Sequence, residues 1–400
     1  MKALFTTWAW PSHFYPLVPV ARALAADGVD VRVVTAPDHL ATVEGTGLIG
    51  VPAGRPVDFH SLLKGALELD PEQSSATTRV AMDYGKLLHA VEVFVEVADA
   101  MLPETIEFAE SWQPDLVVYD LMSYAGPVLA NLRGIPSVRH LWGPDLPGHF
   151  RQVMGRGVGG PVRDLFARYG FDTDDVWGTL TLDNCPPSLQ VDTPYPAQHM
   201  RYVPYYASAG ESAWYGMRTS RPLVCVTGGT TDPVLGAHVF GVPQQIAAIA
   251  ELDVDVVVAV SRADGALLTG LPANVRVVHD VPLHRILADA DVLVSHGGTG
   301  TVLTGVAAGV PQLITPSLPD HAFNAERLAG AGAGLVLDWE DMDRDTICRM
   351  VTDLLPRDGR YAAAARRLKA ENDALPAPAE VVRPLRTLAQ LFDPATAERA

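Results

Sequence analysis

The segment Asp291-Val-Leu-Val-Ser295-His-Gly-Gly-Thr-Gly-Thr301 decides the fold of this 400-residue chain. Its first five residues predict a buried strand, and the apolar residues Leu303, Val306 and Ala307 behind it predict a helix. The glycines between them let the backbone approach a ligand. Unpaired N–H groups in the first helical turn and the positive end of the helix dipole would then favour a diphosphate. A simple strand–helix turn also needs the backbone freedom of glycine, so this alternative stays open.

Polar side chains surround this turn. Thr299 and Thr301 can donate hydroxyl hydrogen bonds, and His296 can donate a ring N–H. The turn matches neither GxGxxG nor GxxxxGK[ST], which argues against a nicotinamide cofactor and against a P-loop. Asp320 and His321 follow the next strand and therefore lie on the same sheet edge. Asp320 can accept hydrogen bonds from vicinal hydroxyls, or it can cap the helix that follows.

Alternating strands and helices extend this unit over the second half of the chain. Strands are expected at Pro222–Thr227, Val254–Val260, Asn274–His279, Asp291–Ser295, Pro311–Thr315 and Gly334–Leu337. Helices are expected at Gly241–Glu251, Leu283–Ala290 and Ala322–Ala331, and further helices run to about Leu391. Such alternation predicts a parallel sheet with helices on both faces.

The first half repeats the rhythm. A strand at Lys2–Trp8, an amphipathic helix closed by Asp27-Gly28 and a strand at Val29–Thr35 form one βαβ unit. Residues 141–197 have weak periodicity and predict loops and short helices over the open sheet edge. The fold class is therefore α/β, with two doubly wound Rossmann-like domains facing each other across a cleft. Further elements of this half are expected at His89–Trp112, Asp115–Asp120, Ala125–Arg133 and Ser137–His140.

The composition limits the class of function. Apolar residues make up 48% and charged residues 19%, which fits two folded domains. With 30 basic and 47 acidic residues the net charge is −17, which argues against nucleic acid or a membrane surface as a partner. No apolar run approaches the roughly 20 residues of a membrane span, and the start lacks a signal peptide, so we expect a cytoplasmic protein. The three cysteines are far apart and are expected to be reduced: Cys185, Cys225 and Cys348.

A histidine and an aspartate follow two strands of the first half. His13 comes directly after the first strand, and Asp120 ends another strand of the same parallel sheet, so both lie at one edge. Neutral histidine can take a proton near pH 7, and a carboxylate on its far ring nitrogen would fix its tautomer. A lone loop histidine is more often solvated, and Asp120 could merely cap its strand. We predict that His13 is a general base and that Asp120 orients it.

Aromatic residues lie close to this histidine in the sequence. They either fill the core or line an apolar acceptor pocket, and we predict the pocket because several of them follow strands. The residues assigned to it are Trp8, Trp10, Phe14 and Trp142.

Taken together, these segments resemble a known enzyme family. The chain is similar to the GT-B inverting natural-product glycosyltransferases, especially the actinomycete enzymes that glycosylate polyketides. The segments that match are His296-Gly-Gly-Thr-Gly-Thr301, Gly309-Val-Pro-Gln312, Pro319-Asp-His-Ala-Phe-Asn-Ala325, Asn184-Cys-Pro-Pro-Ser-Leu189 and Met200-Arg-Tyr-Val-Pro204, and matches run over nearly the whole chain.

The resemblance implies that each domain binds one of the two substrates. Residues 1–205 would bind the acceptor, 206–221 would be a linker, and 222–375 would bind the nucleotide sugar. A helix within 376–400 would pack back on the N-terminal domain. The family pattern also implies that His13 is the base, with an Asp in the position of Asp120. The donor-binding residues would be Thr227, Gly228, Thr230, Val281, His296, Gly298, Thr299, Gly300, Thr301, Asp320 and His321.

Three positions depart from the family pattern. Asp280 replaces the tryptophan that usually supports the nucleobase, and His321 stands where glutamine is common. Ser12 replaces the glycine before the base. The sugar preference of the family therefore cannot be transferred.

The resemblance implies inverting transfer of a deoxysugar from a dTDP-linked donor to a hydroxyl of an apolar polyketide aglycone. UDP as the donor nucleotide and other linkage types stay open, and so does a homodimer. No acidic cluster suggests bound Mg²⁺, so neither a metal ion nor another cofactor is expected. Two alternatives remain: an epimerase acting on the nucleotide sugar, and a non-catalytic nucleotide-sugar-binding helper protein.

Overall fold

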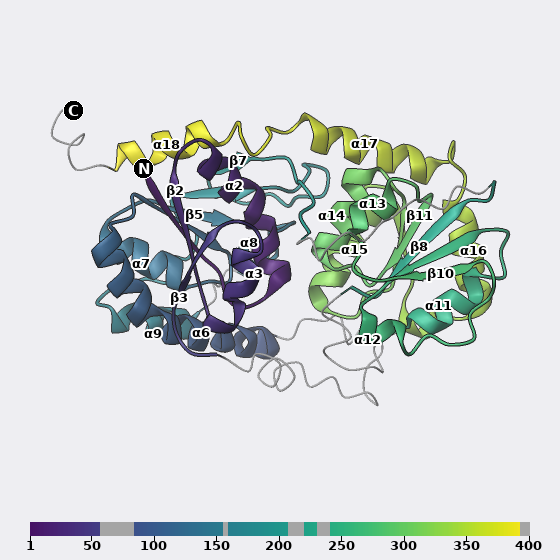
Figure 1. The fold of residues 1–400 in the computed structure, drawn as a ribbon, viewed down its shortest axis with the longest axis horizontal. Helices are drawn as coiled ribbons and strands as arrows, with labels where there is room; N and C mark the ends of the chain where they lie inside the picture. Colours follow the sequence, from purple (N-terminus) through teal and green to yellow (C-terminus); the bar gives the residue numbers. More distant parts are fainter. Residues whose placement is uncertain (57–83, 155–158, 207–219, 230–240, 393–400) are drawn as a thin grey trace.

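The computed structural model describes residues 1–56, 84–154, 159–206, 220–229 and 241–392 (Figure 1). It consists of two lobes, each built around one parallel sheet with helices on both faces. This confirms the predicted α/β class with two doubly wound domains.

The first domain contains a seven-stranded sheet of order β3-β2-β1-β4-β5-β6-β7. All its strands are parallel, and Phe5 of β1 pairs with Val33 on one side and Val118 on the other. The central strands are buried on both faces, as their continuous apolar runs require. The strands are β1 (Lys2–Thr6), β2 (Asp30–Thr35), β3 (Ile49–Pro52), β4 (Leu116–Asp120), β5 (Ser137–His140), β6 (Leu180–Asp183) and β7 (Ala197–His199).

Helices cover both faces of this sheet and enclose two apolar cores. One core lies under the long helix α6 and contains Met101, Leu129 and Phe166; the other contains Phe14 and Leu24. The helices are α1 (Pro11–Phe14), η1 (Tyr15–Leu17), α2 (Val18–Ala26), η2 (Pro37–His39), α3 (Leu40–Glu44), α6 (Tyr84–Trp112), α7 (Ala125–Arg133), α8 (Leu146–Met154) and α9 (Gly160–Arg168).

The second domain repeats the plan with six parallel strands in the order β10-β9-β8-β11-β12-β13. The strand order reverses between β8 and β11, which is where open α/β sheets bind ligands. The strands are β8 (Leu223–Thr227), β9 (Asp255–Ala259), β10 (Val275–Val278), β11 (Val292–Ser295), β12 (Gln312–Ile314) and β13 (Gly334–Val336). The helices are α11 (Val242–Ile249), α12 (Arg262–Gly265), α13 (Leu283–Leu287), α14 (Thr299–Ala308), α15 (Pro319–Gly330), η4 (Trp339–Asp341), α16 (Arg344–Leu354) and α17 (Arg360–Ala374).

The last helix returns to the first domain. Figure 1 shows α17 on the second domain and α18 (Val382–Leu391) on the first, along one side of the molecule. Val382 and Leu385 are buried in the core of the first domain, and Arg386 Nε donates to Asp27 Oδ2 at 2.7 Å. The chain therefore connects its domains a second time.

An apolar seam joins the domains below this crossing. Cys185, Leu189 and Tyr202 come from the first domain but are buried in one cluster with Val302 and Leu303 of α14. Residues 184–202 precede the boundary predicted near residue 205, but Cys185, Leu189 and Tyr202 pack against the second domain. Most of the predicted linker, 206–221, lies outside the described residues.

Some elements were missed in the sequence. β6 continues the first sheet within residues 141–197, where we expected only loops and short helices, and β7 follows at the end of that segment. β7 has three residues, none of them buried, so its alternation is too short to recognise. Helix α15 begins at Pro319 rather than Ala322, because proline is favoured in a first helical turn.

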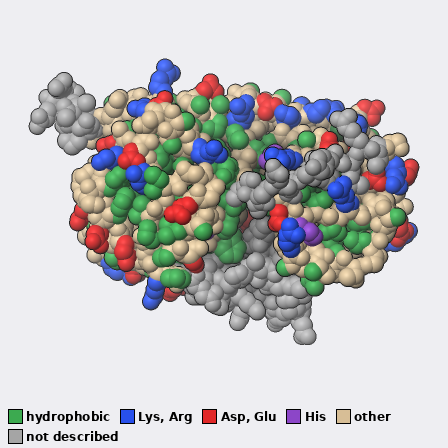
Figure 2. All heavy atoms as spheres, in the orientation of Figure 1, with side chains coloured by type: hydrophobic (Ala, Val, Ile, Leu, Met, Phe, Trp, Pro, Cys, Tyr) green, Lys and Arg blue, Asp and Glu red, His purple; other side chains and the backbone are tan. Residues whose placement is uncertain are grey.

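The surface carries charged side chains of both signs. On the face shown in Figure 2, acidic and basic side chains are interspersed over the described parts of both domains. Within those same ranges, no helix combines the length and the apolar character that a membrane span requires.

We predict that Gly126→Ala destabilises the first domain. A Cβ added at Gly126 of α7 would lie 2.5 Å from Tyr119 Cβ and 2.7 Å from Thr6 Oγ1, and a Cβ attached to the main chain cannot rotate away. Such overpacking should lower the free energy of unfolding by about 1–3 kcal/mol in urea denaturation. Gly160→Ala, in the first turn of α9, has open space around it and serves as the control. Equal unfolding midpoints for the two variants would contradict this packing.

Candidate active site

A hydrogen-bonded pair of His13 and Asp120 lies at the carboxyl edge of the first sheet. Asp120 is the last residue of β4, and His13 lies in the short helix α1 that follows the neighbouring strand β1. His13 Nδ1 is 2.9 Å from Asp120 Oδ2, and the Asp120 side chain is completely buried. The two residues predicted to act together are therefore in direct contact.

The second oxygen of Asp120 is also occupied. Oδ1 accepts from the backbone N–H of Met122 at 3.0 Å and from Trp142 Nε1 at 3.2 Å. These donors hold the carboxylate in one orientation, so that its other oxygen faces the imidazole. A proton on His13 Nδ1 satisfies that oxygen and leaves the lone pair on Nε2. The arrangement makes Nε2 a proton acceptor.

Tryptophans surround the imidazole. The ring of Trp8 meets the His13 ring edge-on at a centroid distance of 4.6 Å, and Trp142 does so at 4.9 Å. Trp10 stacks on Trp8 with centroids 5.5 Å apart. Three of the four residues predicted to line an acceptor pocket thus gather at the histidine, but Trp8 is 3% exposed and belongs to the core, so only Trp10 and Trp142 offer surface to a pocket.

Phe14 does not belong to this group, and that prediction is wrong. Its side chain is completely buried in the core on the other side, where it meets the His39 ring at 5.8 Å. Successive helical residues point about 100° apart, so His13 faces the site while Phe14 faces the core.

The glycine-rich turn of the second domain ends in the N-terminus of α14. Gly298 is the N-cap, and the first helical bond runs from Val302 N to its carbonyl at 3.0 Å. The N–H groups of Thr299, Gly300 and Thr301 precede that bond and have no partner within the helix. They point out of the helix end together with its positive dipole, which favours an anion such as a diphosphate.

His296 fills the space behind this turn. A Cβ at Gly229 would lie 2.3 Å from its ring, and a Cβ at Gly298 would lie 2.4 Å from its Nε2. These glycines therefore make room for the imidazole, a role that the sequence did not reveal. Thr227 Oγ1 accepts from Gly229 N at 3.3 Å, and Gly228 lies between them at the end of β8. The predicted donor residue Thr230 lies outside the described residues.

Asp320 and His321 take different positions at the start of α15. His321 is 3% exposed and is held by Ser317 Oγ at 3.0 Å from its Nδ1, with its ring 4.6 Å from that of His296. His321 is therefore a buried residue that packs against His296, and it does not form the surface of the site. The Asp320 side chain is 36% exposed; the N-cap of α15 is Leu318, and the Asp320 carboxyl interacts with the backbone N–H groups of Asp320 and His321 in the first turn.

Groups of both domains influence the pKa of the Asp320 carboxyl. Burial raises the pKa of its carboxyl, while His296 of the same domain and His13 of the other domain act in the opposite direction. The predicted base and the predicted sugar-binding carboxylate thus interact electrostatically across the two domains.

Two more predicted donor residues have clear positions. Thr299 is 9% exposed, and its hydroxyl accepts from Asn324 Nδ2 at 2.9 Å, so its backbone N–H rather than its side chain faces the site. Val281 is half-buried just after β10. Asp280 before it has φ +57 and accepts from Arg262 Nε at 2.9 Å.

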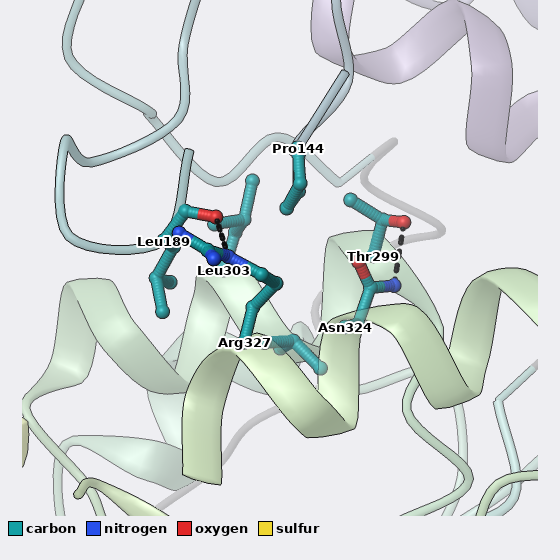
Figure 3. Close-up of a pocket in the computed structure, with 7 residues that line it drawn as sticks. Pro144, Leu189, Thr299, Leu303, Asn324 and Arg327 are labelled. Carbon is teal, nitrogen blue, oxygen red and sulfur yellow. Dashed lines mark hydrogen bonds between the residues drawn. The ribbon is translucent and has the colours of Figure 1, made fainter. Parts of the chain in front are cut away.

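Contacts between the domains were missed from sequence alone. Figure 3 shows Pro144 and Leu189 of the first domain facing Thr299, Asn324 and Arg327 of the second. Arg327 Nε donates to the Leu189 carbonyl at 2.9 Å.

Tyr202 adds a further contact, since its hydroxyl donates to the Gly300 carbonyl at 3.2 Å. The segments around Leu189 and Tyr202 matched the family pattern, but nothing in them indicated that they form the seam. Among the described residues, no group of three or more metal-binding side chains was found.

Two doubly wound parallel-sheet domains, with the His13–Asp120 pair at the carboxyl edge of one sheet and a helix N-terminus at the edge of the other, have the architecture of a glycosyltransferase of the GT-B type. The chain belongs to the erythromycin biosynthesis protein CIII-like family, whose N-terminal domain model matches residues 22–229 and whose C-terminal domain model matches residues 243–388.

Individual relatives agree over the full length. The chain is 32% identical to 10-deoxymethynolide desosaminyltransferase of Streptomyces venezuelae, over 97% of each chain. Among solved structures, it is similar to glycosyltransferase VinC in complex with dTDP, with a TM-score of 0.81 and 33% identity over 98% of this chain and 100% of that one. It is also similar to the spinosyn forosaminyltransferase SpnP, with a TM-score of 0.80 and 34% identity over 98% and 99%.

A buried histidine beside the His13–Asp120 pair should make the stability of the protein depend on pH. His140 ends β5 next to Asp120 and is completely buried, and this burial lowers its pKa from 6.5 to about 4. The unfolded chain then binds the proton more readily, so the stability contributed by neutral His140 is present above pH 6.5 and is lost as the pH falls towards 4. Between pH 7 and 5 this residue should reduce the free energy of unfolding by about 2 kcal/mol.

Urea denaturation at both pH values checks this prediction. His140→Gln cannot titrate, so its loss of stability between pH 7 and 5 should be smaller than that of the wild type by that amount. Parallel losses in the two proteins would show that His140 is not held neutral by burial.

Proposed function

We propose that this glycosyltransferase moves a deoxysugar from a dTDP-linked donor to a hydroxyl of a polyketide aglycone, with inversion at the anomeric carbon. The observation that carries the proposal is the His13–Asp120 pair, which Trp142 contacts through Asp120 while the next residue, Gly143, lies against Thr299 at the N-terminus of α14. The named relatives support the substrate class, because one is a desosaminyltransferase acting on 10-deoxymethynolide and another binds dTDP.

His13 would activate the acceptor. Nε2 takes the proton of the acceptor hydroxyl while its oxygen forms a bond to the anomeric carbon, and the bond from that carbon to the diphosphate oxygen breaks. The imidazole becomes positively charged in this step. Asp120, only 2.9 Å from the other ring nitrogen, stabilises that charge and keeps the ring in place. One displacement of this kind inverts the configuration and needs no covalent intermediate on the enzyme.

The leaving diphosphate would be stabilised by α14. Negative charge grows on it as the bond breaks, and the N–H groups of Thr299, Gly300 and Thr301 are already oriented towards it. Asp320, at the mouth of the gap, is placed to accept hydrogen bonds from sugar hydroxyls. With these groups in position we propose that no metal ion is required.

The tryptophans would bind the aglycone. Trp10 and Trp142 are half-buried beside His13, so their flat rings offer apolar surface next to the base. We propose that the enzyme works in the cytoplasm. Its cysteines form no disulfide there, which fits the free thiols of Cys185, Cys225 and Cys348.

Replacement of the base tests the mechanism. His13→Ala should lower kcat by about 10²–10⁴-fold, because proton transfer to a positioned base contributes that much. The dissociation constant of thymidine diphosphate should not change, since its site is on the other domain. His199→Ala is a matched control, because His199 also lies beside an aspartate, 3.5 Å from Asp183, but on the edge strand β7. Turnover is measured with a panel of dTDP-sugars and polyketide aglycones; an unchanged kcat in His13→Ala would remove His13 from the reaction.

Chelation tests the proposed independence of metal. Transfer by the wild type should proceed at the same rate with an excess of EDTA, because helix dipoles and N–H groups neutralise the leaving group. A rate that falls on chelation and returns on addition of Mg²⁺ would contradict this part of the proposal.

A further inference from the structure

The loop Leu141–Asp145 touches both halves of the proposed reaction centre. It follows β5, and its Trp142 donates to Asp120 Oδ1 at 3.2 Å, so it helps to hold the carboxylate that orients His13. The next residue, Gly143, lies against Thr299 in the first turn of α14. One short loop therefore connects the base pair of one domain with the helix end of the other.

The contact at Gly143 leaves no space for a larger residue. A Cβ added there would lie 2.1 Å from Thr299 Cγ2, whereas the next atoms, Thr299 Cβ and Leu303 Cδ1, would be 3.6 and 3.7 Å away. The backbone of Gly143 is outside the left-handed region, so alanine could adopt its conformation. Glycine is therefore needed here for the close approach of the two domains, and a single methyl group of Thr299 is the obstacle.

The Thr299 side of this contact is rigid. Asn324 Nδ2 donates to Thr299 Oγ1 at 2.9 Å and to the Gly297 carbonyl at 3.0 Å, and Asn324 is 4% exposed. Rotation of the threonine away from Gly143 would break the first of these bonds inside the protein. An unsatisfied buried polar group is costly.

The loop side is equally fixed. Asp145 forms a buried ion pair with Arg139, with 2.6 Å between Oδ2 and the guanidinium. The backbone N–H of Asp145 donates to Gln190 Oε1 at 2.8 Å, and the carbonyls of Leu189 and Gln190 accept from Arg327 of α15. A methyl group at position 143 thus has to push the domains apart or displace Trp142.

We propose that Gly143 is a positioning residue, which sets the spacing between the base on the first domain and the diphosphate site on the second. This inference rests on the proposed function, because spacing matters only if the reaction crosses the gap. Gly143 touches no substrate and acts through Trp142 and Thr299. The bond that forms in the reaction joins an acceptor held by one domain to a sugar held by the other, so a small separation lengthens the path of attack.

Gly143→Ala should therefore lower kcat and leave the binding of thymidine diphosphate almost unchanged. A misplacement of about 1 Å costs on the order of 10²-fold in rate, and we expect a loss of that size in kcat. The dissociation constant of thymidine diphosphate, measured by calorimetry, should stay within about threefold of the wild-type value, because the N–H groups of α14 are unchanged. Gly330→Ala at the end of α15 has open space around it and should keep the wild-type kcat.

A second substitution supplies the decisive control. Thr299→Ser removes the obstructing Cγ2 but keeps the hydroxyl that accepts from Asn324. The kcat of the double variant Gly143→Ala/Thr299→Ser should return to within about threefold of the Thr299→Ser variant. Thermal unfolding should show the same rescue, which tests the contact without any turnover.

Each other outcome has a definite meaning. A wild-type kcat in Gly143→Ala, or an equal loss in the double variant, would overturn the role of Gly143. A loss of thymidine diphosphate binding that matches the loss in kcat would overturn it too. If the wild type transferred no sugar to any aglycone of the panel, the proposed function would fail and the positioning role with it, while rescue in thermal unfolding would still establish the contact.

Discussion

The structure depends on one constraint: the carboxyl edges of two separate sheets must be held at a fixed spacing. In the proposed reaction each sheet offers half of what transfer requires, a base on one side and an anion site on the other. The apolar seam of Cys185, Leu189, Tyr202 and helix α14 fixes this spacing from one side, and the return of α18 ties the chain ends together. Without that seam the two halves would be unrelated binding domains.

Electrostatics follows from this geometry. The buried Asp120 has every oxygen occupied, so it can stabilise a charged imidazole without moving. In the other domain, the end of α14 offers N–H groups that have no partner within the helix and can donate to a ligand. In the proposed reaction, charge that develops during transfer would thus be stabilised on both sides by groups fixed before the substrates arrive. The histidine pair His296 and His321 supports this surface from behind.

Much of this arrangement could be predicted from sequence. The order of strands and helices follows from hydrophobic periodicity, and α7 and β5 have the predicted bounds. His13 and Asp120 could be paired because parallel strands end at one edge. The periodicity of the first turns could not show that Phe14 faces the core, and three-residue β7 has too little pattern to detect. Gly298 stays a predicted ligand contact. That Gly229 makes room for His296 could not be predicted, because it depends on a contact between residues distant in sequence.

A crystal structure with thymidine diphosphate and an aglycone bound tests the central claim most directly. The account predicts the diphosphate at the first turn of α14 and the reacting acceptor oxygen within about 2.6–3.2 Å of His13 Nε2. A nucleotide bound outside the gap between the sheets, or an aglycone whose hydroxyls all point away from that nitrogen, would contradict it.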